Sequence, residues 1–580
     1  MTKIDPPLIY EIECNEKAVK KFKEDLNHES NYKRKIILNY PTVYLYNYKK
    51  SKYYEVYVGE TSDIIRRITQ HFYKSRRGKN DWQEVLKKQS VKMIIMGHNH
   101  FNKSLTLDIE HRLMLYLSAV ENVERIYNRR GNSQNEYYTS DELNLVFSKI
   151  WKQLGTHNPE LFPLESIITD SALFKASPFH KLTEEQYEAK REILSKVQIA
   201  LKSNIKGQVI FVSGEAGTGK TVLNSSLFYE LSTYQEHSDI GKINSYLLVN
   251  HEQQLTVYKQ IAEKLDLYKG NKEIVSKPTQ FINKQSAHNP VDVVLIDEAH
   301  LLWTQGKQSY RGNNQLKDIM ERAKVVIVMF DKKQILRTEQ YWEAQMIEQL
   351  ESQAKSNNSY IELKSQLRIN AGSDTIKWIR NFIDEQKINN IPYDKNGYEI
   401  TIFDTPKQLH KEIKAKSKNT EAGLSRLIAT FDWEYIDKTP PRFKKYWEVV
   451  IDNWKLPWNL QIQPKKEDRK KNKKLAWAEQ KHTIEEVGST FTIQGFDLNY
   501  AGVILGPSVK YRNGKVVFDP SCSKNKKAIQ NRTLSDGSKQ NFADMLLRNE
   551  INVLLTRGVN GLYIYAQDKE LREALQNAKY

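Results

Sequence analysis

The first regular pattern of apolar and polar residues in the chain consists of short apolar runs that are rich in β-branched residues and tyrosine. Residues 43–46 and 54–58 read as two strands, and the charged stretch 49–52 between them predicts a turn. A helix is predicted directly afterwards, with Ser62 or Asp63 as its N-cap. The stripe that this helix would bury consists of Ile64, Ile68 and Phe72. The first part of the chain is therefore expected to be a small α+β domain.

A longer alternation of strand-like runs and helical patterns begins after about residue 180. The runs that read as buried strands are residues 209–213, 245–250, 291–297 and 325–330. This alternation predicts a mostly parallel sheet covered by helices on both faces. Before it, residues 154–178 contain three prolines and no sustained periodicity, which places the main domain boundary there.

Charge and cysteine content narrow the function classes. The net charge of +18 favours a polyanion partner, although a solvated basic surface would give the same composition. Cys14 and Cys522 are the two cysteines, which excludes a disulfide framework and a cysteine-rich zinc site. The N-terminal residues carry charge throughout, and no apolar run approaches a membrane span. We therefore expect a cytoplasmic protein without a membrane partner.

One glycine-rich stretch carries the strongest chemical signal. The sequence VIFVSGEAGTGKT ends a predicted strand and leads into a predicted helix, which is the context of a P-loop. In such a loop the backbone N–H groups surround phosphate oxygens, Lys220 reaches the β- and γ-phosphates, and Thr221 holds Mg²⁺. The alternative is a glycine-rich turn that binds nothing. The residues predicted to contact ATP here are Gly214, Glu215, Ala216, Gly217, Thr218, Gly219, Lys220 and Thr221.

Further polar residues follow the predicted strands in an order that suits a nucleotide site. Asp297 and Glu298 end the run 291–297, where Asp297 would bind Mg²⁺ and Glu298 would orient the attacking water. Gln334 follows the run 325–330 and could sense the γ-phosphate, or be an ordinary turn residue. Gln186 lies about thirty residues before the P-loop and could read the adenine edge, or simply begin a helix.

Three later segments extend this set towards the C-terminus. They are IELKSQLRIN at residues 361–370, TIQGFDLNYAGVILG at residues 492–506 and NVLLTRGVNG at residues 552–561. Together with the P-loop and the strand that ends in the sequence DEAH at residues 297–300, these segments resemble those of superfamily 1 helicases. The resemblance is closest to the bacterial relatives of the Schlafen C-terminal motor domain. The resemblance implies two RecA-like lobes that use ATP and Mg²⁺. It assigns Gln494 and Gly495 to the nucleotide site, Asp497 to the ribose, and Arg368 and Arg557 to arginine fingers from the second lobe.

The N-terminal strands and helix carry a second resemblance. Thr42-Val43-Tyr44 and Tyr57-Val58-Gly59 match the two triplets of the GIY-YIG nuclease family, with Thr42 in place of the first glycine. The resemblance makes Arg67 and His71 catalytic and makes Glu110, on a helix predicted over residues 105–117, the ligand of one Mg²⁺ or Mn²⁺. It assigns the final asparagine to Asn128, with Asn132 as a rival.

The chemistry that these residues can perform is phosphodiester hydrolysis. Arg67 would neutralise developing charge, and Tyr44, helped by His71, would activate water while Tyr57 positions the groups. Glu60 adds a negative charge next to the expected phosphate site. The triplet His98-Asn99-His100 spells the name of another nuclease class, but is expected to be a loop.

Two segments of the expected second lobe look inserted. Residues 431–477 are dense in aromatic and basic side chains, which could grip single-stranded nucleic acid or form a small hydrophobic subdomain with a solvated basic loop. Residues 511–540 form a second, polar insert without an assigned role.

The expected fold class is α/β, with a small α+β GIY-YIG-like domain followed by two RecA-like parallel-sheet lobes. The expected ranges are residues 1–153 for the nuclease domain, 154–180 for a linker, 181–355 for the first lobe and 356–580 for the second, with an insertion around residues 431–480.

The expected function is ATP-dependent processing of nucleic acid by a nuclease joined to a helicase-type motor. DNA is favoured over RNA, and antiphage defence or genome maintenance is the expected role by analogy. A homo-oligomer or partner proteins of a defence system would fit this role. The alternative is a nucleic-acid-gated ATPase sensor or remodeller whose N-terminal domain binds but does not cut.

Overall fold

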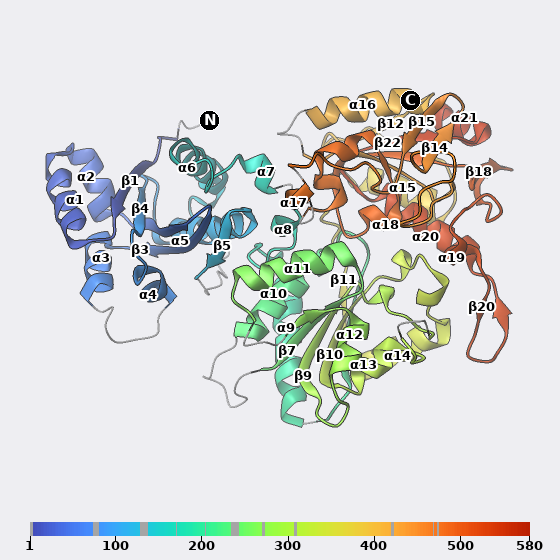
Figure 1. Cartoon of the computed structure of the whole chain (residues 1–580), viewed down its shortest axis with the longest axis horizontal. Coiled ribbons are helices and arrows are strands. Elements are labelled where there is room, and N and C mark those ends of the chain that lie inside the picture. The colour runs from blue at the N-terminus through green and yellow to red at the C-terminus, as the bar shows by residue number, and fades with distance from the viewer. Residues whose placement is uncertain are drawn as a thin grey trace. The chain divides into compact units, whose positions relative to one another are not determined.

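The computed structural model describes residues 4–73, 81–127, 137–169, 171–203, 205–233, 243–268, 273–306, 310–418, 423–467, 469–472 and 475–579. It divides into two compact units. The first consists of Met1–Leu182 and Val257–Glu273, and the second of Thr183–Thr256 and Ile274–Tyr580. Figure 1 labels many of the helices and strands of each.

The first unit is built on a five-stranded sheet with the order β1-β4-β2-β3-β5. All neighbours in it are antiparallel except β3 and β5. The two predicted strands lie within β2 and β3, which form a hairpin around the expected turn. The strands are β1 (Leu8–Glu13), β2 (Thr42–Lys50), β3 (Tyr53–Thr61), β4 (Lys92–Gly97) and β5 (Val123–Ile126).

Helices pack around this sheet. Ile64 and Ile68 of α3 share one apolar core with Tyr44 and Tyr46 of β2, as their helical spacing predicts. The predicted helix over residues 105–117 lies within α5, which Asn102 caps by accepting a hydrogen bond from the Leu105 N–H. The helices are α1 (Glu16–His28), α2 (Asn31–Asn39), α3 (Ile64–Tyr73), α4 (Asp81–Leu86), α5 (Lys103–Ala119), α6 (Leu143–His157), α7 (Glu165–Thr169) and α8 (Ala172–Lys175).

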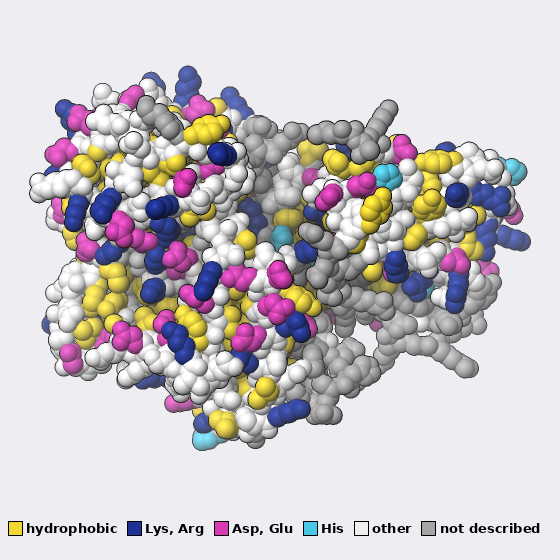
Figure 2. All heavy atoms as spheres, turned by 180° about the vertical axis from the view of Figure 1, so that it is seen from behind, with side chains coloured by type: hydrophobic (Ala, Val, Ile, Leu, Met, Phe, Trp, Pro, Cys, Tyr) yellow, Lys and Arg dark blue, Asp and Glu magenta, His cyan; other side chains and the backbone are white. Residues whose placement is uncertain are grey.

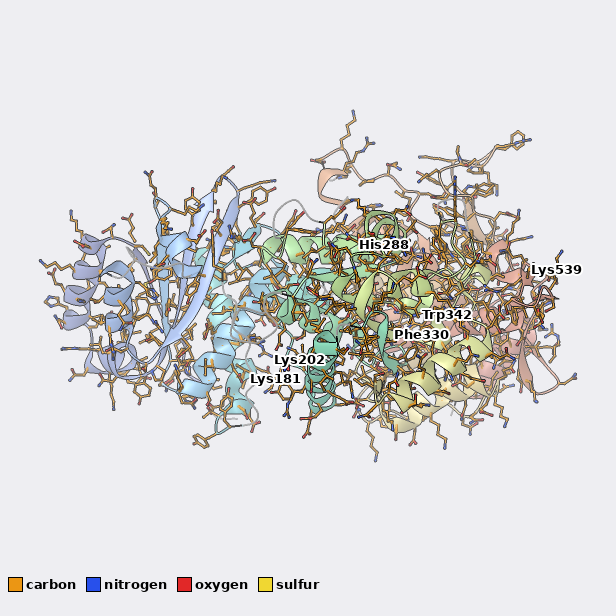
Figure 3. All side chains as sticks on the ribbon, turned by 90° about the horizontal axis from the view of Figure 1, so that it is seen from below. Lys181, Lys202, His288, Phe330, Trp342 and Lys539 are labelled. Carbon is orange, nitrogen blue, oxygen red and sulfur yellow. The ribbon has the colours of Figure 1, made fainter. Side chains whose placement is uncertain are left out.

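The second unit contains a six-stranded sheet with the order β11-β6-β10-β9-β7-β8, in which every pair is parallel. Phe330 at the end of β10 packs edge to face on Trp342, with 5.5 Å between the ring centroids (Figure 3). The strands are β6 (Gln208–Gly214), β7 (Ser245–Val249), β8 (Val275–Ser276), β9 (Val291–Asp297), β10 (Ala323–Phe330) and β11 (Tyr360–Leu363). The helices are α9 (Glu184–Ser203), α10 (Lys220–Thr233), α12 (Pro278–Lys284), α13 (Gln315–Met320) and α14 (Ala344–Ser356). Helix α11 (Glu252–Lys264) begins in this unit, and its residues from Val257 onwards belong to the first.

A second parallel sheet of five strands follows in the same unit, with the order β12-β22-β17-β13-β16. Its strands are β12 (Glu399–Ile402), β13 (Arg426–Ala429), β16 (Val487–Gly488), β17 (Leu498–Leu505) and β22 (Gly558–Ala566). Its helices are α15 (Ser373–Asp384), α16 (Pro406–Lys418), α18 (Thr490–Ile493), α20 (Ala543–Leu555) and α21 (Lys569–Asn577). The two parallel sheets and the small N-terminal sheet confirm the predicted α/β fold class.

The inserted segments form small substructures. Trp458 and Trp477 are fully buried, and Trp458 belongs to a core with Phe431 and Val449. Most aromatic side chains of residues 431–477 are therefore used for packing, which favours the small hydrophobic subdomain. The elements are β14 (Glu448–Ile451), β15 (Trp454–Pro457), α17 (Arg469–Asn472), β18 (Val509–Arg512), β19 (Lys515–Phe518), α19 (Lys526–Ile529), β20 (Arg532–Thr533) and β21 (Lys539–Gln540).

The ranges of the four expected parts remain predictions. Strand β11 pairs with β6, so residues 360–363 lie in the first sheet of the second unit. The described residues of the expected linker, 154–180, include the end of α6 and the whole of α7 and α8.

Candidate functional site

Aromatic side chains gather on one face of the N-terminal sheet. Tyr46 stands opposite Tyr57 in the register of β2 and β3, and Tyr44 stands opposite Gly59. Cross-strand partners point to the same face, so the tyrosines of both triplets share it. The ring centroids of Tyr44 and Tyr57 are 6.3 Å apart. His71 of α3 joins this group, with its ring centroid 5.9 Å from that of Tyr44.

Gly59 leaves the space into which Tyr44 packs. A Cβ atom at Gly59 would collide with Cζ and the hydroxyl oxygen of Tyr44. A side chain at this position would displace the buried ring, because protein interiors have no room for such overlap. The glycine of the second triplet therefore fixes the tyrosine of the first.

His71 makes a buried hydrogen bond with a tyrosine that the sequence had not singled out. Its Nδ1 atom lies 3.0 Å from the hydroxyl oxygen of Tyr46. Burial, together with the positive charge of Arg67, lowers the pKa of His71 to about 3. The imidazole is therefore neutral at physiological pH.

The charge of Arg67 also acts on Tyr44. Burial raises the pKa of the Tyr44 phenol well above its ordinary value, and Arg67 opposes this shift. Tyr44 is accordingly protonated at neutral pH, and Arg67 is the nearby cation that favours its phenolate.

Glu60 does not bring an uncompensated charge to the sheet face that carries Tyr44, Tyr46 and Tyr57, which is here named the tyrosine face. It stands opposite Val43 in the hairpin register, so its side chain points to the other face of the sheet. There its two carboxylate oxygens each accept a hydrogen bond of 2.5 Å from Lys103 Nζ at the start of α5. Thr42, the other departure from the family triplet, is buried opposite Thr61.

The remaining nuclease residues are placed less completely. Glu110 lies on α5 with its side chain half-buried. Asn128 and its rival Asn132 lie outside the described residues. Among the residues that the structure describes, no three His, Cys, Asp or Glu side chains are grouped so that they could hold a metal ion. A single carboxylate suits Mg²⁺, which is usually bound by one or two carboxylates together with substrate phosphate and water.

The P-loop of the second unit has the backbone geometry that the glycine spacing predicts. Gly217 and Gly219 have φ angles of +93° and +75°. A Cβ atom at Gly217 would collide with the Gln366 amide, and one at Gly219 with the Gln186 amide. Lys220 Nζ donates hydrogen bonds to carbonyl oxygens of the loop, at 2.7 Å to Gly214 and 2.8 Å to Glu215.

Two glutamine side chains support this loop from outside. Gln186 of α9 is buried and donates to the Thr218 carbonyl oxygen at 3.1 Å, while its own carbonyl oxygen accepts from the Thr183 N–H. Gln366 donates to the Ala216 carbonyl oxygen at 2.9 Å. Gln186 therefore lies at the P-loop.

The other P-loop residues flank these contacts. The Glu215 carboxylate lies 2.7 Å from Lys333 Nζ and 3.2 Å from Arg380 Nη1 of α15. Thr221 lies in the first turn of α10, next to Lys220, with its side chain half-buried.

The two acidic residues after β9 lie in a buried polar cluster. Asp297 Oδ2 accepts a hydrogen bond of 2.7 Å from Gln254 Nε2 of α11. Glu298 has a φ angle of +50°, a left-handed conformation that costs energy for a residue with a side chain. Its carboxylate lies 3.4 Å from His300 Nε2, and burial lowers the pKa of His300. Strain of this kind concentrates at functional sites.

A chain of polar contacts leads from the P-loop lysine to an arginine of the second sheet. Lys220 Nζ lies 3.7 Å from Asp331 Oδ2, and the same oxygen accepts a hydrogen bond of 2.7 Å from Gln334 Nε2. Gln334 Oε1 in turn accepts a hydrogen bond of 3.0 Å from Arg557 Nη2. Arg557 is fully buried, and burial together with the charge of Arg368 lowers its pKa to about 9. It still carries its charge at neutral pH.

The remaining predicted residues lie close to this chain. Arg368 Nε lies 2.5 Å from Asp497 Oδ1, so the two residues form an ion pair. The family resemblance assigned Arg368 to the phosphates and Asp497 to the ribose. Gln494 is buried, with its Nε2 atom 3.3 Å from His300 Nε2 and 3.4 Å from the Gln334 carbonyl oxygen. Gly495 follows with a φ angle of +83°.

Two residues of these clusters were missed from the sequence. Tyr46 is two positions from Tyr44, so strand alternation could have placed both on one face. Gln254 gave no local signal, because its partner Asp297 lies far away in the sequence.

Comparison with known proteins adds to this geometry. A family model described as Schlafen group 3, DNA/RNA helicase domain, matches residues 207–568, which is more than half of the chain. The chain belongs to this family. A model described as GIY-YIG catalytic domain matches residues 40–119. Both resemblances inferred from the sequence are thereby confirmed.

A relative of similar extent is known from yeast. The chain is 33% identical over 444 residues to a Saccharomyces cerevisiae protein named Uncharacterized protein YPL245W. The match covers 70% of this chain and 93% of the yeast protein.

The two matched domains make the chain a nucleic-acid-processing enzyme with a GIY-YIG nuclease domain and a helicase-type domain. On the face that Figure 2 shows, Lys and Arg side chains are interspersed with Asp and Glu. None of the helices in the described part of the chain is both long and apolar enough to cross a bilayer.

Proposed function

We propose that the chain is an ATP-dependent nuclease, in which ATP hydrolysis between the two parallel-sheet lobes drives or licenses cleavage by the GIY-YIG domain. The observation that carries the proposal is the contact chain from Lys220 through Asp331 and Gln334 to Arg557. It joins the P-loop to an arginine of the second lobe that lies between α20 and β22. A nucleotide on the P-loop would thus be sensed by both lobes.

The residues around the P-loop fit ATP and Mg²⁺. The positive φ angles of Gly217 and Gly219 let backbone N–H groups form a phosphate cradle, and a Cβ atom at either position would collide with the glutamine that supports the loop. Asp297 supplies a buried carboxylate at the end of a parallel strand, where ligands of such sheets bind. Bound magnesium would neutralise charge on the phosphates. Thr221 and Asp297 are the residues that we propose to hold it.

Each side chain of the motor site then has a distinct task. Lys220 exchanges its two carbonyl contacts for phosphate oxygens, and Glu298 orients the attacking water. Arg557 and Arg368 stabilise negative charge that develops on the γ-phosphate. For this purpose Arg368 must leave its ion pair with Asp497, which frees Asp497 for the ribose.

The remaining predicted contacts complete the nucleotide site. We propose that Gln186, next to Gly219, contacts the adenine, and that Gln494 and Gly495 contact the nucleotide from the second lobe. We propose that the hydrogen bonds of Gln334 change with the presence of the γ-phosphate. Its amide already bonds both Asp331, near Lys220, and Arg557.

The nuclease chemistry rests on the tyrosine face. A divalent ion held by Glu110 would polarise the scissile phosphate. Arg67 neutralises charge on the phosphate and, by the same field, favours loss of the Tyr44 proton. Tyr44 then accepts a proton from water. Neutral His71 holds Tyr46, and Tyr57 packs against Tyr44, so both keep the general base in place.

DNA is the favoured substrate over RNA, and antiphage defence or genome maintenance is the proposed role. The net charge of +18 and the family description, which names DNA and RNA together, support a nucleic acid as the substrate. The role itself rests on analogy between domain combinations. A homo-oligomer, or partner proteins of a defence system, and a cytoplasmic location belong to the same proposal.

The test is to incubate the purified chain with ATP, Mg²⁺ and a panel of labelled DNA and RNA substrates, and to follow ATP hydrolysis and cleavage in the same samples. The proposal expects nucleic-acid-stimulated hydrolysis and ATP-dependent cleavage. Lys220→Ala should abolish both, whereas Arg67→Gln should abolish cleavage alone.

Three other outcomes would each contradict a different part of the proposal. Cleavage that persists in Arg67→Gln and in Glu110→Gln would refute the assigned nuclease site. Cleavage that is independent of ATP in the wild type would refute the coupling. Stimulated hydrolysis without any cleavage would favour a nucleic-acid-gated sensor.

A further inference from the structure

The insertion in the second lobe exposes one loop whose composition differs from the packed subdomain beneath it. This loop, residues 436–445, is here named the aromatic-basic loop. Phe443 is 96% exposed, the highest value among the large apolar side chains of the described residues. Around it stand four cations and one carboxylate, which are Lys438, Arg442, Lys444, Lys445 and Asp437.

The loop is held in shape at its base. The Trp447 indole N–H, just beyond the loop, donates a hydrogen bond of 2.7 Å to the carbonyl oxygen of Thr439 inside it. The Trp447 N–H and carbonyl oxygen each pair at 2.8 Å with the side-chain amide of Gln461. Pro440 and Pro441 lie inside the loop and restrict its backbone further. Binding to this loop would therefore cost little ordering entropy.

The aromatic residues near the loop in sequence pack on one another without Phe443. Phe431 packs on Trp458 with 4.9 Å between ring centroids, and Trp433 packs on Trp458 at 6.2 Å. The subdomain core is therefore complete without Phe443. The Phe443 ring is left in water and forgoes the gain of burial. It lies within a run of residues that contains four cations.

We propose that the aromatic-basic loop is a contact for single-stranded nucleic acid, with Phe443 stacking on an unpaired base and Arg442, Lys444 and Lys445 contacting phosphates. This inference rests on the proposed function and names a surface for its substrate. A base in a duplex is already stacked on its neighbours, whereas an unpaired base offers a free face to an aromatic ring. The excess of cations matches a phosphate backbone.

The cations of the loop are available for this contact. The side chain of Lys438 is 90% exposed, and its distance to Asp437 is 4.0 Å. Lys444 is 61% exposed, and lies 3.5 Å from Glu448. The Lys438–Asp437 pair is open to water on both sides and is therefore weak. Glu448 is only 14% exposed, but it also lies 3.6 Å from Lys455, which stays beside it when Lys444 contacts a phosphate.

The test measures binding of the full chain to a fluorescent oligothymidylate and oligouridylate of about 16 nucleotides, and to a duplex of the same length. Phe443→Ala should weaken single-strand binding about five- to hundredfold, the range expected for loss of one stacked base, and leave duplex binding unchanged. Phe443→Trp should bind as the wild type does. Tyr393→Ala is the matched control, because Tyr393 is 78% exposed in the same unit and should not affect binding.

The phosphate contacts are tested by the salt dependence of single-strand binding. The double variant Lys444→Gln, Lys445→Gln should reduce the slope of log K against log salt by about 1.4, which is 0.7 for each phosphate contact. An unchanged slope would overturn the phosphate contacts.

Other outcomes separate this inference from the proposed function. Wild-type affinity in Phe443→Ala, or an equal loss for duplex and single strand, overturns the stacking contact while nucleic-acid binding stands. If the wild type binds none of the oligonucleotides, the proposed function fails, and this inference fails with it. Stronger binding of a polyglutamate competitor than of oligothymidylate would assign the loop to an acidic protein instead.

Discussion

Arg557 donates a hydrogen bond of 3.0 Å from its Nη2 atom to Gln334 Oε1, although 223 positions separate the two residues in the chain. Gln334 follows the β10 strand of the first parallel sheet, and Arg557 precedes the β22 strand of the second. The same glutamine amide donates to Asp331, which faces the P-loop lysine. One side chain thus connects the lobe that carries the P-loop to the arginine proposed to complete the site.

Replacing Gln334 by leucine is expected to slow ATP hydrolysis. The change removes hydrogen bonds to two charged groups, which are typically worth about 1.5–3 kcal/mol each, so kcat should fall about 10²- to 10⁴-fold. The KM for ATP should change little, because the P-loop is untouched. Steady-state hydrolysis with excess nucleic acid measures both constants, and an unchanged kcat would show that Gln334 does not act in the reaction.

Gly59→Ala should disable the nuclease and spare the motor. The added Cβ would collide with the Tyr44 ring, which must then leave its buried position. The strain should lower the free energy of unfolding by about 1–3 kcal/mol. Cleavage should be lost while ATP hydrolysis keeps its wild-type rate, which serves as the internal control for folding. Full cleavage by this variant would contradict the role of Tyr44.

His71 should make the stability of the chain depend on pH below about 6.5. Its pKa is about 3 in the folded protein and 6.5 in the unfolded chain. Above pH 6.5 both states hold a neutral imidazole, and below it the unfolded chain binds a proton that the folded state refuses. Stability should therefore fall by up to about 1.4 kcal/mol for each pH unit between 6.5 and 3.

The comparison for this prediction is His71→Asn, which removes the titration. Urea unfolding at pH 7.5, 6.5, 5.5 and 4.5, roughly spanning the pKa window, should show a steeper loss for the wild type than for the variant. Parallel curves for the two proteins would mean that His71 is not held neutral by burial.

Two glutamates of the nuclease domain should differ sharply in their effect on cleavage. Glu110→Gln removes the proposed metal ligand and should abolish cleavage at any Mg²⁺ or Mn²⁺ concentration. Glu60→Gln should leave cleavage within about twofold of wild type, because Glu60 is paired with Lys103 on the other face of the sheet. Single-turnover cleavage assays over a metal titration decide the point. Loss of cleavage in Glu60→Gln alone would reverse the assignment.

Local sequence patterns were enough to predict much of the fold and part of the candidate site. Strand alternation and helical spacing brought Tyr44, Tyr57, Arg67 and His71 to neighbouring elements, because these periods fix which side chains share a face. The P-loop was equally predictable, since the glycines at 217 and 219 are required by their φ angles.

The partners of these residues were less predictable. The sequence grouped His71 with Tyr44, and the two rings are neighbours, but the hydrogen bond between His71 and Tyr46 was not predicted. It treated Arg368 and Asp497 as separate nucleotide contacts, whereas they form an ion pair. Both depend on how segments far apart in the chain pack together, and a local pattern carries no information on such packing. Gln254, which bonds Asp297, was missed for the same reason.

The most direct test of a nucleotide site completed by both lobes is ATP hydrolysis by Arg557→Lys. Lysine keeps the charge but cannot reproduce the guanidinium contacts to Val553, Phe496 and Gln334. Hydrolysis should fall by about 10³-fold or more, while binding of a fluorescent ATP analogue stays within about threefold of wild type. Wild-type hydrolysis by this variant would contradict the account, because the P-loop lobe would then work without the arginine of the second.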